Sequence, residues 1–364
     1  MTRQIHQLLP TLAYGDAIGN HVLELRQLFR ENGYQSEIFA ERWHPKLGGT
    51  CRPFREYDRV SGPDNVVLLH YSTGGDVNTY AMNLPDQVLL YYHNITPPHF
   101  FYDVNGEFAR RLMEARAYLA EMAGKVPAIA ASPYNANELR GFGFDVVGVA
   151  PPFIHFRRLH EVNNDKDAEE FRKRFGKYGT FDWLSVGRLS PNKRISDIIK
   201  AFYYYQRWID ADSRLLLVGT SEGTENYVTE LYRLVSQLEL DGSVVFVGQV
   251  PHTVLPFCYQ MADIYICMSE HEGFCLPLLE AMHFGVPVVA YASTAVPDTM
   301  GDAGMLIRRK EPALVAEAVH EIAVNTELRQ QLVAGQRARL SVYLPEAIKS
   351  QIMTILQPFL HKVE

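Results

Sequence analysis

The chain has 364 residues, of which 47% are hydrophobic and 21% are charged, and its formal net charge is −7. This length favours two domains, and the composition is ordinary for a globular enzyme. The negative balance disfavours a general nucleic-acid binder, although it leaves room for a local basic site.

The cysteines and the apolar runs point to a reducing compartment. Cys51, Cys258, Cys267 and Cys275 show no C-x-x-C spacing, so we expect free thiols in the cytosol. The first fifteen residues have too short an apolar region for a signal peptide, and no run reaches the length of a membrane span. A cytoplasmic protein is predicted. A helix expected over residues 105–124 mixes arginines with apolar residues, which leaves peripheral contact with the inner membrane surface open, but its glutamates favour a solvated face.

Strand-like and helix-like runs alternate along the chain, as is typical of parallel sheets with crossover helices. In the first half, strands are expected at residues 4–9, 66–70, 88–93, 127–131 and 146–149. A charged, helical connector is expected at residues 161–177. In the second half, strands are expected at residues 181–186, 214–218, 244–247 and 263–268, and helices at 311–325, 327–340 and from Pro345 onward.

A glycine-bearing loop, residues 14–20, follows the first expected strand. A backbone of this kind can approach a phosphate closely, which makes Gly15 and Asp16 candidate ligand contacts. The alternative is that the glycines simply make the turn. The loop carries no G-x-G-x-x-G pattern, so a nicotinamide cofactor is disfavoured.

A basic loop follows the expected strand 181–186. Residues 187–193 read GRLSPNK. Arg188 offers a planar fork for a phosphate, and Lys193 offers a compact second charge. Because both lie at a strand-to-helix turn, their charges can converge on a helix N-terminus. An exposed basic loop is the structural alternative.

A second loop carries two carboxylates. Residues 269–285 read SEHEGFCLPLLEAMHFG, with Glu272 in the loop and Glu280 in the helix that follows. A carboxylate accepts hydrogen bonds from paired hydroxyls, which sugars and riboses carry. The carboxyl end of a parallel strand is where open α/β sheets bind ligands, and the N–H groups at a helix start suit a phosphate. The alternatives are a solvated helical Glu280 and an ordinary loop residue at Glu272.

The E-x7-E pattern with G-F inside, followed by G-x-P-V-V and preceded by G-R-L-x-P-x-K, resembles the retaining glycosyltransferases of family 4, the glycosyl transferases group 1. The resemblance covers most of the second half and, more loosely, the first. It implies an α/β GT-B fold of two Rossmann-like parallel-sheet domains facing across a cleft. Residues 1–155 would form the acceptor-side domain and residues 156–343 the nucleotide-sugar donor domain, with a terminal helix, 344–364, packing back on the first.

The resemblance also implies roles for single residues. Arg188 and Lys193 would hold the diphosphate and stabilise charge on the leaving group, Glu280 would bind the ribose, and Glu272 would hold the donor sugar. His93, at the end of the expected strand 88–93, would lie near that sugar, or else be structural. The remaining implied donor-binding residues are Gly15, Asp16, Gly219, Val250, Gly273, Phe274, Cys275 and Leu276.

These observations predict a retaining, metal-independent hexosyltransferase that moves a sugar from a nucleoside diphosphate sugar to the hydroxyl of an acceptor saccharide or lipid-linked saccharide. The resemblance implies that backbone groups bind the base, and a UDP-sugar is slightly favoured over a GDP-sugar. We expect polysaccharide or glycolipid synthesis, with no cofactor and no nucleic acid. Asp210-Ala-Asp212 precedes a strand rather than following one, and no cluster has metal-ligand spacing.

Three alternatives stay open. One is a nucleotide-sugar epimerase or hydrolase of the same fold. Another is a non-catalytic nucleotide-sugar-binding subunit, against which the intact set of Arg188, Lys193, Glu272 and Glu280 counts. The third is a pyridoxal-phosphate sugar phosphorylase, for which no Schiff-base lysine is identified.

Overall fold

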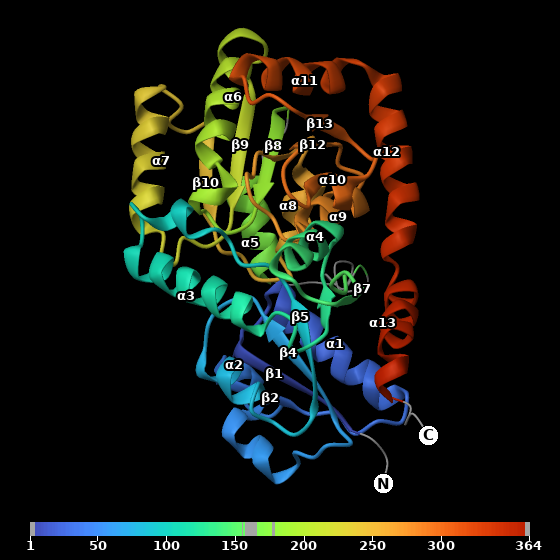
Figure 1. The fold of residues 1–364 in the computed structure, drawn as a ribbon. Coiled ribbons are helices and arrows are strands. Elements are labelled where there is room, and N and C mark those ends of the chain that lie inside the picture. Colours follow the sequence, from blue (N-terminus) through green and yellow to red (C-terminus); the bar gives the residue numbers. More distant parts are fainter. Residues whose placement is uncertain (1–3, 155, 157–165, 177–178, 361–364) are drawn as a thin grey trace. The chain divides into compact units, whose positions relative to one another are not determined.

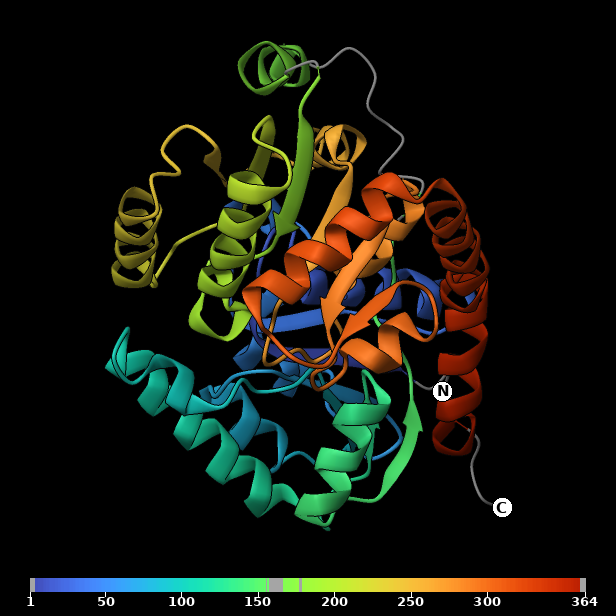
Figure 2. The same cartoon turned by 90° about the horizontal axis from the view of Figure 1, so that it is seen from above.

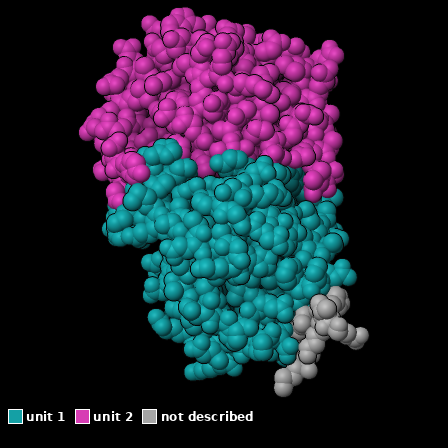
Figure 3. All heavy atoms as spheres, in the orientation of Figure 1, with its two compact units in different colours: residues 1–99, 107–154, 343–364 teal, residues 100–106, 155–342 magenta. Residues whose placement is uncertain are grey.

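The computed structural model describes residues 4–154, 156, 166–176 and 179–360. The chain divides into two compact units, shown in Figure 3. Unit 1 comprises residues 1–99, 107–154 and 343–364, and unit 2 comprises residues 100–106 and 155–342. Each unit is built on one parallel sheet covered by helices (Figure 1).

The sheet of unit 1 has the strand order β3-β2-β1-β4-β5-β6-β7, and all of its pairs are parallel. The order reverses between β1 and β4, which makes this pair a topological switch point. The inner strands are apolar and buried on both faces, as parallel strands under helices require. The strands are β1 (Ile5–Leu12), β2 (Ile38–Trp43), β3 (Arg52–Pro53), β4 (Val66–Tyr71), β5 (Gln87–Tyr92), β6 (Ala128–Ala130) and β7 (Val146–Val149).

The last helix of the chain belongs to the core of unit 1. Its residues Ile348, Ile352 and Leu356 are fully buried in one apolar cluster with Ile5 of β1 and Leu25 of the first helix. The i, i+4, i+8 spacing of the three places them on one face, which packs on the sheet. The helices of unit 1 are α1 (Ala17–Glu31), α2 (Asp76–Ala81), α3 (Gly106–Met122), α4 (Pro133–Phe142) and α13 (Pro345–Leu360).

The sheet of unit 2 has the order β10-β9-β8-β11-β12-β13, again with parallel pairs, and its switch point lies between β8 and β11. Its strands are β8 (Phe181–Val186), β9 (Ser213–Val218), β10 (Val244–Gly248), β11 (Ile264–Cys267), β12 (Val288–Tyr291) and β13 (Met305–Ile307).

Helices α6 and α11 lie side by side on one face of this sheet (Figure 2), over a core around the fully buried Trp183. The helices of unit 2 are α5 (Lys166–Phe175), α6 (Ile195–Trp208), α7 (Glu225–Gln237), α8 (Leu255–Met261), α9 (Leu276–His283), α10 (Val296–Met300), α11 (Pro312–Val324) and α12 (Thr326–Leu340).

The expected elements agree with the observed ones within a few residues, and β8 has the predicted bounds. The sequence pattern did not predict β2, whose second half is charged and partly exposed, or the two- and three-residue edge strands β3 and β13. The expected connector helix, 161–177, lies partly outside the described residues, and α5 covers its described part.

The helix expected over residues 105–124 is α3, and its surface is polar. Arg110 pairs with Glu114 at 2.6 Å and Arg111 pairs with Glu107 at 3.4 Å, on side chains that are half-exposed or more. This agrees with the solvated face that its glutamates indicated. Within the described part of the chain, no helix is both long enough and apolar enough to cross a bilayer.

Candidate functional site

The candidate site of unit 2 lies where β8 and β11 end, at the switch point of its sheet. Because the two strands are parallel neighbours, the loops that follow them leave the sheet at the same edge. A hollow of about 260 Å³, which includes open solvent, lies between the loops. It is lined by Ser185, Val186, Gly187, Arg188, Lys193, Ile195, Tyr265, Cys267, Ser269 and Glu272.

An ion pair joins the two loops across this hollow. Lys193 Nζ lies 2.6 Å from Glu272 Oε1, and the two side chains are 22% and 8% exposed. Burial alone would lower the pKa of Lys193, but the Glu272 carboxylate, with smaller contributions from Cys275 and Cys267, raises it above its usual value. The site therefore holds a fixed ammonium at the edge where a ligand would enter.

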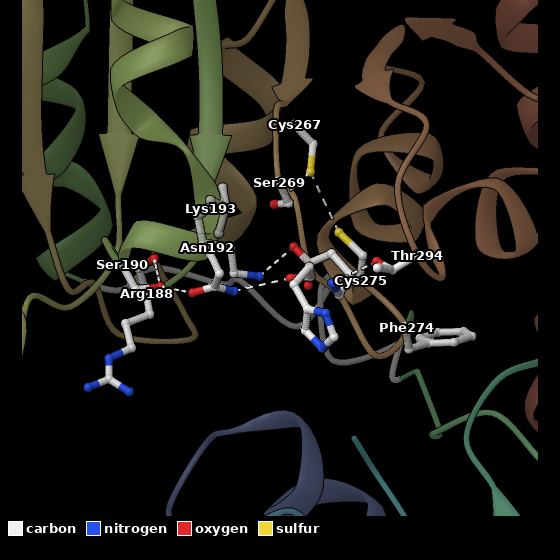
Figure 4. Close-up of polar contacts among 12 residues, drawn as sticks. Arg188, Ser190, Asn192, Lys193, Cys267, Ser269, Phe274, Cys275 and Thr294 are labelled. Carbon is white, nitrogen blue, oxygen red and sulfur yellow. Dashed lines mark hydrogen bonds and ion pairs between the residues drawn. The ribbon is translucent and has the colours of Figure 1, made fainter. Parts of the chain in front are cut away.

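Asn192 fastens the same two loops through backbone and side chain (Figure 4). Its Oδ1 accepts from Ser190 Oγ at 2.8 Å, and its Nδ2 donates to the carbonyl of His271 at 3.1 Å. The backbone N–H of Glu270 donates to the Asn192 carbonyl at 2.8 Å. Sequence reasoning passed over Asn192, because it stood inside P-x-K as a variable letter.

A third loop, after β12, supports the loop that carries Glu272. Thr294 Oγ1 accepts from the Glu272 N–H at 2.8 Å, and Ser293 Oγ donates to the Ser269 carbonyl at 2.6 Å. Thr299 Oγ1, on α10, donates to the carbonyl of Phe274 at 2.5 Å. Each of these hydroxyls forms a hydrogen bond with a backbone group in a loop, where the regular pairing of a helix or sheet is absent. Sequence reasoning missed all three, because nothing in the neighbouring sequence marks them.

Arg188 and Lys193 do not converge here, in contrast to the expectation. Arg188 donates from its guanidinium to the carbonyl of Glu222, in the loop after β9, at 2.8 Å. Figure 4 shows its side chain directed away from Lys193 and from the two cysteines. Burial lowers the pKa of Arg188 from its usual value. The two cations therefore flank the loop that follows β8 instead of meeting at one point.

Gly219 and Val250 lie at the same sheet edge as Arg188, after β9 and β10. Gly219 has φ +150°, and a Cβ there would lie 1.8 Å from the carbonyl oxygen of Gly187. Only glycine allows the two loops to approach so closely. Val250 is half-buried. Two of the implied donor-binding residues are thus brought to one edge of the sheet.

The segment before α9 is tightly held. Cys275 is the N-cap of α9 at φ +75°, a left-handed conformation that is uncommon for a residue with a side chain. Phe274 and Cys275 are buried, whereas Gly273 and Leu276 are half-buried. These residues place the start of α9 beside Glu272.

Glu280 is engaged within the protein. It lies on α9 and accepts a hydrogen bond from the hydroxyl of Tyr259, on α8, at 2.6 Å. Burial raises its pKa. The side chain is half-buried, so the tyrosine orients a carboxylate that is still partly accessible.

The four cysteines are free thiols, as predicted, and all four are buried. Two of them are closer than the sequence suggested: Cys267 Sγ lies 3.9 Å from Cys275 Sγ. Together with the Glu272 carboxylate they form a group whose ligand atoms lie within 4.8 Å of one another. A metal ion would fit this donor set only by displacing the Lys193 ammonium from Glu272.

The predicted residues of unit 1 lie at the carboxyl ends of β1 and β5. Gly15 has φ +80°, and Asp16 caps α1 by accepting from the Gly19 N–H at 2.6 Å, which gives it a structural task. His93 follows β5, and its Nε2 lies 2.9 Å from Nδ1 of the buried His70. Burial lowers the pKa of His93 to about 3, so the ring is neutral near pH 7.

The motifs that make up the site of unit 2 fall inside one family. Residues 167–339 match the family described as glycosyl transferases group 1. The similarity to the glycosyl transferases group 1 therefore lies within unit 2. The match spans both predicted loops, that of Arg188 and Lys193 and that of Glu272 and Glu280, so the resemblance expected from the sequence is confirmed.

The family relatives match in parts. The O-antigen chain mannosyltransferase B of Escherichia coli is 34% identical over 126 residues, which cover 34% of this chain and 32% of that protein. The N-acetyl-alpha-D-glucosaminyl L-malate synthase of Bacillus anthracis is 34% identical over 177 residues, 47% of this chain and 44% of that protein. The matches thus span less than half the length of these curated relatives.

Solved structures show the same fold over nearly the whole chain. Anabaena HepE, solved in complex with UDP and glucose, has a TM-score of 0.75 at 18% identity, over 98% of this chain and 100% of its own. The likeness confirms the predicted GT-B class of two Rossmann-like units.

Proposed function

We propose that this protein is a retaining glycosyltransferase of the group 1 family. Unit 2 would bind a nucleoside diphosphate sugar, and unit 1 would supply groups for the sugar and the acceptor. The transferred group is a hexose, the acceptor is a saccharide or lipid-linked saccharide, and a UDP-sugar is the first donor to try. The complex of HepE with UDP and glucose supports that choice.

The observation that carries the proposal is the Lys193–Glu272 pair at the switch point of unit 2. A cation held in a part-buried site attracts a diphosphate more strongly than one in open solvent, because the local dielectric is low. When a diphosphate takes the ammonium, Glu272 is released to accept hydrogen bonds from sugar hydroxyls. Asn192 and Thr294 keep both loops in place during this exchange.

The other residues divide the donor among them. Arg188 would leave the Glu222 carbonyl and form charge-assisted hydrogen bonds with the phosphates. Glu280, oriented by Tyr259, would accept from the ribose hydroxyls. Gly219 and Val250 would present backbone groups to the base, and the amides at the start of α9 would face the sugar and the phosphate.

The chemistry proposed is attack from the face that the diphosphate leaves. The bond between the anomeric carbon and the phosphate oxygen breaks, a bond from the acceptor oxygen forms on the same face, and the departing phosphate oxygen takes the acceptor proton. Lys193 and Arg188 would stabilise the charge that develops on the diphosphate. The reaction needs no separate protein base.

The test starts with thermal unfolding in the presence of UDP, GDP, ADP and their sugars. A ligand at about 100 times its dissociation constant should stabilise the protein by about 2.7 kcal/mol. The donor found is then incubated with candidate acceptors, release of the nucleoside diphosphate is followed, and the product anomer is read by NMR. An inverted anomer, or absence of stabilisation by any nucleotide or nucleotide sugar, would contradict the proposal.

A further inference from the structure

A continuous line of hydrogen bonds crosses three neighbouring strands of unit 1 and ends on His93. It begins at the backbone carbonyl of Val22, on α1, which accepts from Gln7 Nε2 at 3.0 Å. Gln7 Oε1, on β1, lies 3.0 Å from His70 Nε2, and His70 Nδ1, on β4, lies 2.9 Å from His93 Nε2. Gln7 and His70 are 0% and 1% exposed, so water does not substitute for these partners.

The direction of every bond in this line follows from its first member. A backbone carbonyl only accepts, so the Gln7 group that faces Val22 must be the NH₂, and the group that faces His70 must be the oxygen. His70 must then carry its proton on Nε2. In the neutral ring this leaves a lone pair on Nδ1, which requires that His93 donate from Nε2.

The line requires both imidazoles to be neutral, and their surroundings favour this. Burial, with the neighbouring His93 and His21, lowers the pKa of His70 well below its usual value, and burial lowers that of His93 to about 3. The rings are also held in orientation: the His93 plane makes angles of 13° and 17° with those of Tyr91 and His70. His93 therefore has one tautomer and one orientation available.

The remaining nitrogen of His93 is the one that a ligand would meet. His93 is half-buried, and no group among the described residues forms a hydrogen bond with its Nδ1. We propose that Gln7 and His70 are positioning residues that keep the proton of His93 on Nε2, so that Nδ1 offers a lone pair to a substrate hydroxyl. A hydroxyl can donate to this lone pair, whereas a phosphate oxygen cannot.

The proposed tautomer of His93 does not depend on what the protein binds, whereas a substrate hydroxyl as its partner rests on the proposed function. The first experiment therefore uses the free wild-type protein. Long-range ¹⁵N–¹H NMR correlations of histidine-labelled protein distinguish protonated from unprotonated ring nitrogens, and loss of signals in His70→Phe and His93→Gln assigns the rings. We expect a proton on Nε2 and none on Nδ1 of both rings at neutral pH. A proton on Nδ1 of either ring overturns the proposal.

A pair of variants tests whether Gln7 is the cause. Gln7→Met removes the amide at similar side-chain length, so His70 can turn its proton to Nδ1 and His93 should populate the Nδ1–H form. Tyr91→Phe is the matched control: it removes an equally buried bond, from the Tyr91 hydroxyl to the Ala150 carbonyl at 2.8 Å, and leaves the line intact. A His93 that keeps its proton wholly on Nε2 in Gln7→Met excludes Gln7 as a positioning residue.

Calorimetry with UDP, UDP-glucose, GDP and GDP-mannose then separates this proposal from the proposed function. Gln7→Met should weaken binding of the nucleotide sugar about fivefold to tenfold, the effect of one hydrogen bond, and leave the nucleotide unchanged. Equal loss for sugar and nucleotide in Gln7→Met would indicate general damage and overturn the positioning role. If wild-type protein binds none of these probes, the proposed function fails, while the NMR result still decides the tautomer.

Discussion

The two units carry different kinds of polar side chains near the switch points of their sheets, charged in unit 2 and neutral in unit 1. In unit 2 the strands next to the switch point end in a charged pair, Lys193 and Glu272, 2.6 Å apart. In unit 1 the strands β1, β4 and β5 carry a neutral line, Gln7, His70 and His93, and burial lowers the pKa of both imidazoles. A similar sheet thus positions a charged group in unit 2, whereas in unit 1 it fixes which atoms of a hydrogen-bonded line donate and which accept.

Under the proposed function, this difference would correspond to the two halves of a nucleotide sugar. A diphosphate is recognised by cations and helix-start amides, and it would be repelled by a lone pair. A group with a fixed role as donor or acceptor distinguishes a sugar hydroxyl from other ligand groups better than a group that can either donate or accept. The predictions below test whether unit 2 binds the diphosphate through its cations and unit 1 binds a hydroxyl through a fixed acceptor.

The largest expected effect is in unit 2. Lys193→Met leaves the Glu272 carboxylate buried without its partner, which should cost about 3–5 kcal/mol of stability in denaturant unfolding. It should also weaken binding of the nucleoside diphosphate about tenfold or more, since hydrogen bonds to charged groups contribute roughly 1.5–3 kcal/mol. Both quantities can be measured on one preparation, by urea titration and by calorimetry.

The control is a second buried ion pair, on two strands of the same sheet. Arg214 and Asp182 lie 2.5 Å apart at the amino ends of β9 and β8, away from the candidate site, with side chains 8% and 4% exposed. Arg214→Met should lose comparable stability and keep its affinity for the nucleotide. If both variants lose affinity equally, the Lys193 effect is one of folding and the phosphate assignment is wrong.

A second prediction separates the two carboxylates of unit 2. Glu280→Gln should mainly raise the Michaelis constant, because the ribose changes little as the glycosidic bond breaks. Glu272→Gln should mainly lower the catalytic constant, because the sugar becomes oxocarbenium-like. Each effect should be about tenfold or more. Steady-state kinetics with the donor found above decides it, and a change confined to the Michaelis constant in Glu272→Gln would remove the division of roles.

A third prediction concerns unit 1 and pH. The folded-state pKa of His93 is lowered to about 3 from 6.5, so the unfolded chain binds its proton first as the pH falls. The contribution of His93 is therefore intact above about pH 6.5 and is lost towards pH 3, with a slope of up to about 1.4 kcal/mol per pH unit. His70, whose pKa is also lowered, acts in the same direction.

Urea unfolding of wild-type protein and of His93→Gln at several values between pH 7 and pH 4 measures this slope. The variant should give the flatter curve, and Tyr91→Phe should keep the slope of the wild type. Glu280 in unit 2 responds with the opposite sign, because burial raises its pKa and its contribution is lost as the pH rises above 4.5. A His93→Gln curve parallel to that of the wild type would show that His93 is not held neutral.

The share of the candidate site residues that could be predicted from the sequence also differs between the units. In unit 2 the cations and carboxylates could be predicted because charged residues at strand ends are conspicuous and their spacing matches a family pattern. Asn192 and Thr294 were missed because the partner of each lies in another loop, 79 positions away for Asn192 and 22 for Thr294.

In unit 1 the sequence marked His93 but not its partners. Gln7 lies inside a strand of apolar character, and His70 was passed over as an ordinary strand-end residue. Their importance arises from the registers of β1, β4 and β5, which bring three distant side chains into one line. Alternating strands and helices predict a parallel sheet, whereas the neighbours across it depend on strand order, which the pattern of one sequence does not specify.

The smallest expected effect is that of metal removal. Cys267, Glu272 and Cys275 could hold a soft metal ion, since their ligand atoms lie within 4.8 Å of one another, but the Lys193 ammonium occupies the Glu272 carboxylate. Two thiols alone make a poor structural site, because zinc usually takes four protein ligands.

If Lys193, Arg188 and the start of α9 compensate the leaving diphosphate, turnover should be unchanged within error after dialysis against excess chelator. Lys193→Met offers the internal comparison, because it frees the carboxylate and should raise the affinity for zinc measured by calorimetry. Loss of wild-type turnover with chelator, restored by magnesium or manganese, would mean that unit 2 relies on a metal ion as well as on its two cations.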